Sequence, residues 1–380
     1  MRTPRVLLVM GLAAAGMYTV SAKRLSVLSA SRGAMSAHSD ESALLKAFAE
    51  IQPIDAHMRV YRDDPALDAL IERLKVRMLN ICVIDDRDPF FKGLEPQRSD
   101  VLSFFHRTGG RAAFCTTFSP YDFEDPGFSK RVIRQLDADF AAGAVAVKIY
   151  KVMGMEMKSK AGKYVMADDP AFEPIYQDIA AHHRTVVAHL AEPDSCWQPP
   201  NPASPDYEYY KEHPAEYAYA HPEWPAKAAI LAARDHLLAE NPKLRVVGAH
   251  LGSMEADVNE MAQRFDRYPN FAVDTAARVP YFMLQPREKV RAFLIKYQDR
   301  ILYATDLVVM PLDNTEKALQ EWTSTYERDW KFFATDQTVE YKGHNAHGLL
   351  LPDSVLRKLY HDNAVRWIPG IVGRVVHTLR

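Results

Sequence analysis

From residue 51 onward, short apolar runs rich in β-branched residues alternate with longer stretches in which apolar residues recur every three or four positions. The short runs are typical of buried strands and the longer ones of amphipathic helices, so the pattern predicts βα units and a parallel sheet. Strands are predicted at 51–57, 78–84, 111–117, 144–150, 185–189, 244–250, 271–274 and 301–306. Helices are predicted at 129–142, 170–183, 225–240, 254–268 and 287–297. Eight such units predict a (β/α)8 TIM barrel.

The competing α/β architecture is a doubly wound open sheet. That fold commonly carries a glycine-rich G-x-G-x-x-G turn after its first strand, and this chain has none there. The barrel is therefore the preferred prediction, with residues 38–380 as a single domain.

Two segments are longer than a minimal barrel needs. Residues 193–225 follow the fifth strand and contain eight prolines together with seven tyrosines and tryptophans, among them Trp197. This composition is too rich in helix breakers for a helix and too aromatic for a disordered linker. It predicts an ordered cap over the end of the barrel where such enzymes place their chemistry. The second segment, 307–347, follows the eighth strand and includes a helix predicted at 315–333.

Composition and charge narrow the class of partner. Of the 380 residues, 48% are hydrophobic and 25% are charged, as in ordinary globular proteins. The formal net charge is only -2, which gives no electrostatic footprint for nucleic acid. A small-molecule substrate is therefore expected. The sequence does not decide between a monomer and a homodimer.

The first residues have the pattern of an export signal. Arg2 and Arg5 precede an uncharged apolar run from Val6 to Val20, and Val20-Ser21-Ala22 offers the small-x-small pattern of a cleavage site. We therefore expect a signal peptide at 1–22, with 37 as its outer limit, and a periplasmic or secreted protein. The alternative is an uncleaved anchor, because Val6 to Ala22 spans 17 residues, the lower limit for crossing a bilayer. No later segment is apolar enough to span a membrane.

Three of the fourteen histidines fall at the ends of predicted strands. His57 closes the first strand, His189 the fifth and His250 the sixth, while Asp306 closes the eighth. The carboxyl ends of parallel barrel strands converge on one mouth, so these four residues are expected to meet there. Imidazole nitrogens with a carboxylate form a ligand set suited to zinc and its divalent neighbours.

These motifs, in this order, resemble the amidohydrolase superfamily, specifically the amidohydrolase-related branch that contains aminocarboxymuconate-semialdehyde decarboxylase. The resemblance covers about residues 51–368. It rests on the strand-end histidines and on the motifs Ile54-Asp55-Ala56-His57, Gly143 to Lys148, Tyr303-Ala304-Thr305-Asp306 and Leu351 to Tyr360 with Asn363-Ala364.

The resemblance implies a role for each matching residue. His57, His189 and Asp306 would bind one divalent metal, with zinc as the first choice. His250 would be a further ligand or would position the attacking water, and Asp306 would also act as general base. The implied activity is a metal-dependent hydrolase or non-oxidative decarboxylase acting on a small organic acid, ester, lactone or amide, with hydrolysis preferred.

One position departs from the family pattern. The first motif of the family is His-x-His, whereas this chain has His57-Met58-Arg59. Residues two apart on a strand face the same way, so Arg59 is expected where the second imidazole would bind, and a guanidinium has no lone pair for a metal. The metal is then held by fewer ligands, bound weakly, or lost, with Arg59 binding an anionic substrate group. The alternative function is a catalytically degenerate barrel that binds an anionic small molecule.

Three further residues are candidates for the substrate pocket. Lys148 lies near the end of the fourth strand, where some superfamily members carry a carbamylated lysine bridging two metals. The preferred interpretation is an unmodified lysine that contacts substrate or a carboxylate, because the missing second histidine disfavours a two-metal centre. Glu192 and Trp197 are the other two candidates. Cys82, Cys115 and Cys196 are not expected to form a disulfide framework.

Overall fold

A computed structural model describes residues 42–341 and 343–373, which belong to one compact unit running from Glu41 to Arg380. The signal peptide predicted at 1–22 lies outside the described residues. Within the described part, no helix has both the length and the apolar character needed to cross a lipid bilayer.

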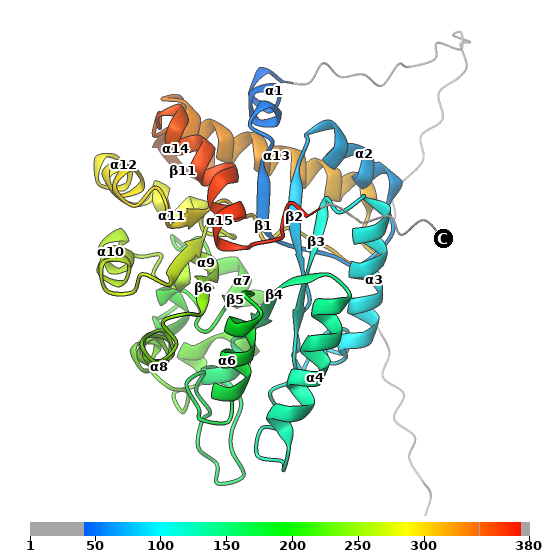
Figure 1. Ribbon diagram of the computed structural model, residues 1–380. Helices are drawn as coiled ribbons and strands as arrows, with labels where there is room; N and C mark the ends of the chain where they lie inside the picture. Colours follow the sequence, from blue (N-terminus) through cyan, green and yellow to red (C-terminus); the bar gives the residue numbers. More distant parts are fainter. Residues whose placement is uncertain (1–41, 342, 374–380) are drawn as a thin grey trace, which may run out of the picture. The chain divides into compact units, whose positions relative to one another are not determined.

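The central element is a sheet of parallel strands in chain order (Figure 1). The strands are β1 (Ile54–Val60), β2 (Arg77–Ile81), β3 (Ala112–Thr117), β4 (Ala144–Ile149), β5 (Thr185–Ala188), β6 (Arg245–Gly248), β7 (Phe271–Asp274), β8 (Ile301–Leu302) and β9 (Val308–Val309). β8 pairs with β7 and β9 pairs with β1, so the segment 301–309 closes the sheet into a barrel. The predicted (β/α)8 fold is confirmed.

Helices surround the strands (Figure 1). Those that follow the strands or complete the outer layer are α1 (Ala43–Glu50), α2 (Pro65–Arg73), α3 (Leu94–Arg107), α4 (Phe128–Ala141), α6 (Glu173–Ala181), α8 (Lys227–Glu240), α10 (Val258–Arg267), α12 (Arg287–Lys296), α13 (Thr315–Ala334), α14 (Asp353–Arg357) and α15 (Asn363–Trp367). Their apolar faces pack on the outside of the barrel, as the three-and-four periodicity predicts. A hairpin of β10 (Thr338–Tyr341) and β11 (His344–His347) follows α13.

The barrel interior forms a separate apolar cluster. Small and branched side chains fill it, including Ala56, Ala113, Ala146, Val187 and Val247 from successive strands. A second apolar cluster lies on the outer side of the strands and packs against the helices. Cys82, Cys115 and Cys196 are buried as free thiols.

Residues 193–225, where the sequence predicts a cap, form short helical turns. The segment contains η1 (Asp194–Trp197), α7 (Tyr207–Glu212), η2 (Pro214–Glu216) and η3 (Ala218–Ala220). The prolines limit each turn to a few residues, as expected from the lost N–H donors.

Several strand boundaries differ from the prediction. β8 ends at Leu302, so Asp306 lies between β8 and β9 and not at the end of a strand. β1 begins at Ile54, because Ser42 caps a helix that the sequence analysis missed and Ile51 ends it. β1 also continues past His57 to Val60, so His57 lies within the strand and not at its end. β6 stops at Gly248, two residues before His250, because the chain there turns into a left-handed conformation.

Candidate active site

A cavity of about 290 Å³ opens at the carboxyl ends of the barrel strands. This volume is at the lower end of the range for small-molecule sites. Seven of the eight predicted site residues line it, together with side chains from the cap: His57, Arg59, Lys148, His189, Glu192, His250 and Asp306 from the prediction, and Asp206, Tyr209 and Tyr210 from the cap.

Trp197 is the exception. Its indole N–H donates to the carbonyl of Pro225, 3.2 Å away, at the far end of the cap, and it does not line the cavity. The aromatic surface of the cavity comes instead from Tyr209 and Tyr210 of α7, with Tyr150. Placing Trp197 in the pocket was wrong because an aromatic in a cap can pack within the cap itself.

An irregularity in β1 turns His57 and Arg59 toward the cavity. The register of β1 against β2 shifts between Asp55 and Met58. On a regular strand, Ala56 and Met58 would face the same side. Ala56 packs inside the barrel and Met58 packs in the outer layer, so the inward and outward alternation of side chains is interrupted between them. A bulge of this kind changes the direction in which side chains point, and here the side chains of His57 and Arg59 line the cavity at the mouth.

His57 is fixed from both sides of its ring. Its Nδ1 lies 2.9 Å from Oδ2 of Asp274, which can only accept, so Nδ1 carries the proton. The other nitrogen, Nε2, lies 3.1 Å from Nζ of Lys148 and accepts from that ammonium. Burial and the charge of Lys148 lower the pKa of His57, against the opposing effect of Asp274. His57 is therefore a neutral imidazole whose lone pair is already engaged.

Asp274 was missed by the sequence analysis. It is the last residue of β7 and is fully buried. Besides His57, its carboxylate accepts from the backbone N–H of His250 at 2.8 Å and of Ala276 at 3.1 Å. The rule that selected Asp306, a carboxylate at the end of a predicted strand, would also have selected Asp274.

The substitution Asp274→Asn tests this role. The amide oxygen of the new side chain still accepts from the backbone, but its NH2 then faces Nδ1 of His57 and forces the proton onto Nε2, against the Lys148 ammonium. We expect a loss of about 100-fold in kcat/KM, typical for a side chain that orients an imidazole. Circular dichroism and the urea midpoint check that the variant is folded. Full activity in Asp274→Asn would mean that the tautomer of His57 does not matter.

His250 sits on a strained left-handed turn directly after β6. Residues 250–253 all have φ between +58° and +60°. For residues other than glycine this conformation costs on the order of 1 kcal/mol or more each, and it persists only where the surroundings enforce it. Arg234 donates to the carbonyl of Gly252 at 2.6 Å, Ser253 Oγ donates to the carbonyl of Ala191, and Asp274 holds the N–H of His250. Such strain is concentrated at functional positions.

The imidazole of His250 is oriented by its own hydrogen bond. Nδ1 donates to the carbonyl of Ala276 at 2.9 Å, which leaves Nε2 as the nitrogen with the lone pair. Burial and the neighbouring imidazoles of His189 and His57 keep the pKa of His250 well below its usual value. The rings of His189 and His250 lie 4.2 Å apart between centroids.

Gly248 allows the turn to fold back onto β7. A Cβ at this position would lie 2.8 Å from the ring of Phe271 and 2.9 Å from the backbone Cα of Gly252. We expect Gly248→Ala to destabilise the protein by about 1–3 kcal/mol, the usual cost of overpacking. Urea unfolding measures it, with Gly93→Ala as the control, since a Cβ at Gly93 meets only ordinary contacts. Equal midpoints for the two variants would contradict the close packing.

Arg59 and Asp306 form an ion pair at the mouth. Nη2 of Arg59 donates to Oδ1 of Asp306 at 2.9 Å, and the same oxygen lies 3.6 Å from Nε2 of His57. Burial raises the pKa of Asp306, but Arg59, His57 and Lys148 outweigh it, so the net pKa is lowered. Because Oδ1 of Asp306 already accepts from Arg59, this oxygen is not free for a substrate proton, which disfavours the general-base role that the resemblance implies for Asp306.

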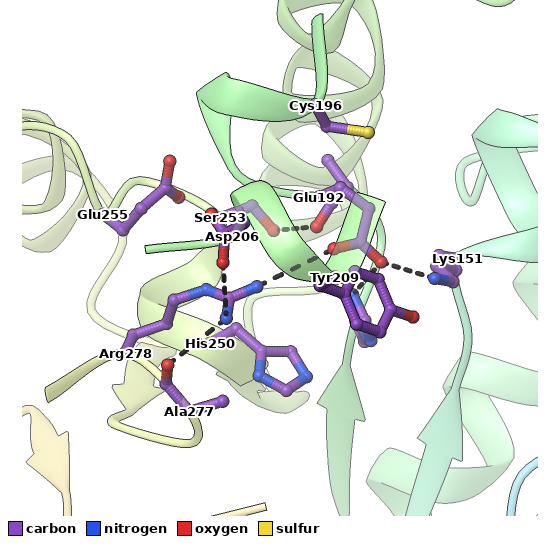
Figure 2. Close-up of polar contacts among 12 residues, drawn as sticks. Lys151, Glu192, Cys196, Asp206, Tyr209, His250, Ser253, Glu255, Ala277 and Arg278 are labelled. Atoms are coloured by element: carbon purple, nitrogen blue, oxygen red, sulfur yellow. Dashed lines mark hydrogen bonds and ion pairs between the residues drawn. The ribbon is translucent and has the colours of Figure 1, made fainter. Parts of the chain in front are cut away.

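A network of buried ion pairs joins the cap to three barrel loops (Figure 2). Nζ of Lys151 lies 2.5 Å from Glu192 and 2.7 Å from Glu216 of the cap. Arg278 lies 3.7 Å from Glu192 and 4.0 Å from Asp206 of the cap. Lys151, Asp206 and Arg278 were not predicted, because they come from loops whose juxtaposition exists only in the folded chain.

Glu192 is the centre of this network. Burial raises its pKa, but Lys151, His189 and Arg278 together hold the pKa well below its usual value, so Glu192 is ionised. Its Oε1 lies 3.5 Å from Nε2 of His189, whose own pKa burial lowers to about 4. All three imidazoles of the mouth are therefore neutral near pH 7.

The mouth does not present a metal-binding set. A tetrahedral zinc at about 2.0–2.3 Å from each ligand needs three or four donor atoms about 3.4 Å from one another. In the described part of the chain, the only three such side chains with ligand atoms all within 4.8 Å are Asp137, Asp178 and His182, on the outer surface at α4 and α6. At the mouth, the predicted ligand nitrogen of His57 accepts from Lys148, and Asp306 binds Arg59. The residues present do not fit the implied metal.

A family model matches more than half of the chain. A model of the amidohydrolase family matches residues 99–369. A search of curated proteins found no match. The chain is similar to solved structures of 2,6-dihydroxybenzoate decarboxylase from Rhizobium, with 15% identity, 83% of this chain and 98% of that chain covered and a TM-score of 0.48.

Two further structures cover a similar share of the chain. One is 5-carboxyvanillate decarboxylase LigW from Sphingomonas paucimobilis, with 14% identity, 84% and 99% coverage and a TM-score of 0.45. The other is a dihydroxybenzoic acid decarboxylase from Polaromonas sp. JS666 with bound manganese and 2-nitroresorcinol, with 12% identity, 83% and 96% coverage and a TM-score of 0.46. At these values the likeness says nothing about the chemistry of this site.

Proposed function

The chain belongs to the amidohydrolase family, and on this premise we propose that it is an enzyme that hydrolyses an ester, lactone or amide bond in a small organic anion. The observation that carries the proposal is the arrangement at the mouth. Neutral imidazoles, with the lone pair of His250 Nε2 as a base, share one small cavity with fixed cations.

The cations favour an anionic substrate. Arg59, Lys148, Lys151 and Arg278 line the cavity, against the carboxylates of Glu192, Asp206 and Asp306. With neutral histidines, the cations that line the cavity exceed the lining carboxylates by one; Glu216 and Asp274 lie behind the lining and are not counted. The Nε–H groups of Arg59 and Arg278 are buried and have no hydrogen-bond partner among the described residues. Both arginines line the cavity, so a carboxylate oxygen of the substrate would find charged donors there.

The base is assigned to His250. Its Nε2 takes a proton from a water molecule, and the water oxygen bonds to the carbonyl carbon of the substrate. The C–O or C–N bond to the leaving group then breaks, and the leaving group takes the proton back from the imidazolium. The strained turn and the Ala276 carbonyl hold the ring in one orientation for both transfers.

Lys148 supports the negative charge that develops on the carbonyl oxygen. Burial lowers the pKa of its ammonium to about 8, against the opposing effect of Asp274 and Asp306, so it stays largely charged at pH 7. One of its three N–H donors is used by His57, which leaves donors for a substrate oxygen. A fixed cation in a buried site stabilises such charge strongly.

A paired-substrate screen of the purified native chain tests the function. Carboxylate-bearing esters, lactones and amides are assayed beside analogues whose carboxylate is masked as a methyl ester or primary amide, and CO2 release from small aromatic and enoic acids is followed in parallel. We expect hydrolysis that favours the free carboxylates and falls in Arg59→Gln through a higher KM. CO2 release without hydrolysis would replace hydrolysis by decarboxylation, and binding of anions without turnover in either assay would overturn the enzymatic proposal.

A further inference from the structure

The positive charge at the mouth lies on atoms that block two of the three predicted metal ligands, His57 and Asp306. Nζ of Lys148 is 3.1 Å from the nitrogen of His57 that would face a metal, and Nη2 of Arg59 is 2.9 Å from Oδ1 of Asp306. Because Asp274 fixes the proton of His57 on Nδ1, the only free lone pair of the ring is on Nε2, and this lone pair already accepts from Lys148.

The contact between Lys148 and His57 is buried, which makes it hard to displace. Lys148 is 1% exposed and His57 is 2% exposed. A metal ion could reach the His57 lone pair only by displacing the Lys148 ammonium, and the ammonium would then lie buried beside a second cation. Two cations a few ångströms apart repel strongly where water is excluded. The Arg59 guanidinium, which is paired with Asp306, would be a third positive charge beside the metal ion and the Lys148 ammonium.

We propose that this mouth works without a resident metal, and that the Lys148 ammonium and the Arg59 guanidinium supply the positive charge that the family resemblance assigns to a divalent ion. The inference deepens the function proposed above and rests on it for the location of the site. Lys148 polarises the substrate carbonyl, and Arg59 binds the substrate anion while holding Asp306. Arg59 of the altered first motif, His57-Met58-Arg59, and Lys148 of β4 thus act together in place of a metal ion.

Metal content of the purified full-length chain is the direct test. The protein is prepared without chelator, dialysed against metal-free buffer and measured by elemental analysis, and Zn²⁺ and Mn²⁺ are titrated by calorimetry. We expect far less than one metal per chain. Zinc binding that disappears in His182→Asn would come from the outer group at α4 and α6 and would agree with the proposal. One metal per chain that is lost in His57→Asn would overturn it.

A gain-of-binding variant gives the converse test. Arg59→His combined with Lys148→Ala removes both cations and restores the second imidazole. We expect its association constant for Zn²⁺ at the mouth to rise by at least about 100-fold, the scale on which groups around a metal change affinity. Adding His57→Asn should abolish the gain. If the combined variant does not fold, the metal content of the native chain still tests whether the mouth holds a metal.

These measurements need no substrate. A protein that lacks metal yet turns over nothing in the screen would remove the proposed function and leave the replacement of the metal standing. Where turnover is found, incubation with EDTA should leave kcat/KM unchanged. A loss of activity that Zn²⁺ restores would contradict the inference while leaving hydrolysis intact.

Discussion

Replacing His250 by asparagine is expected to lower kcat/KM by about 100- to 10,000-fold, the usual contribution of a positioned general base. The substitution removes Nε2, the only nitrogen of this ring with a lone pair toward the cavity. Asparagine is chosen because it tolerates the left-handed φ of +59° at this position, so the turn should survive. The loss should lie mainly in kcat, because the arginines that bind the anion are untouched.

The control for this variant is His236→Asn. His236 lies on α8, is largely exposed and pairs with Asp168 outside the mouth. Its kcat/KM should equal that of the native protein. If His250→Asn retains more than about a tenth of the native kcat/KM, the loss is smaller than a positioned base contributes, and the base is a different group. An equal loss in Asp306→Asn with normal substrate binding would return the base to Asp306.

Replacing Lys151 by methionine is expected to destabilise the protein by about 3–5 kcal/mol, because breaking a buried ion pair leaves its partner charge without compensation. Lys151 and Glu192 are nearly fully buried, and their charged atoms lie 2.5 Å apart. Arg278, 3.7 Å from Glu192, remains in place and compensates only in part for the lost contact (Figure 2). The loss also removes the bond from Lys151 to Glu216 of the cap.

Urea unfolding and limited proteolysis measure the two consequences. The free energy of unfolding should fall in Lys151→Met, and cleavage within 193–225 should become faster than in the native chain. Lys160→Met is the matched control, since Lys160 forms an exposed pair with Asp125 at 3.3 Å, and such pairs contribute about 0–1 kcal/mol. Similar changes in the two lysine variants would show that the network does not hold the cap.

The sequence by itself determined the architecture. The alternation of β-branched runs with three-and-four periodicity was sufficient for eight strands and for most of their helices, because both signals are local and the barrel repeats one unit. It did not predict α2 or α3. The sequence also placed His189, His250 and Asp306 near one mouth, since parallel strands must present their carboxyl ends together. The prediction of an ordered cap at 193–225 rests on its composition, because prolines restrict the chain and aromatics supply area to bury.

Tertiary structure decided the chemistry of the mouth. The reset in β1 that turns His57 inward depends on pairing with β2, and the strained turn of His250 depends on Arg234, Ser253 and Asp274 from other elements. The ion network of Lys151, Glu192 and Arg278 joins loops that no sequence period relates. Above all, whether His57 offers its lone pair to a metal or accepts from Lys148 depends on a separation of 3.1 Å across the barrel. Residue types determine which partners a side chain can have, but only packing chooses among them, because that choice depends on distance, burial and neighbouring charge.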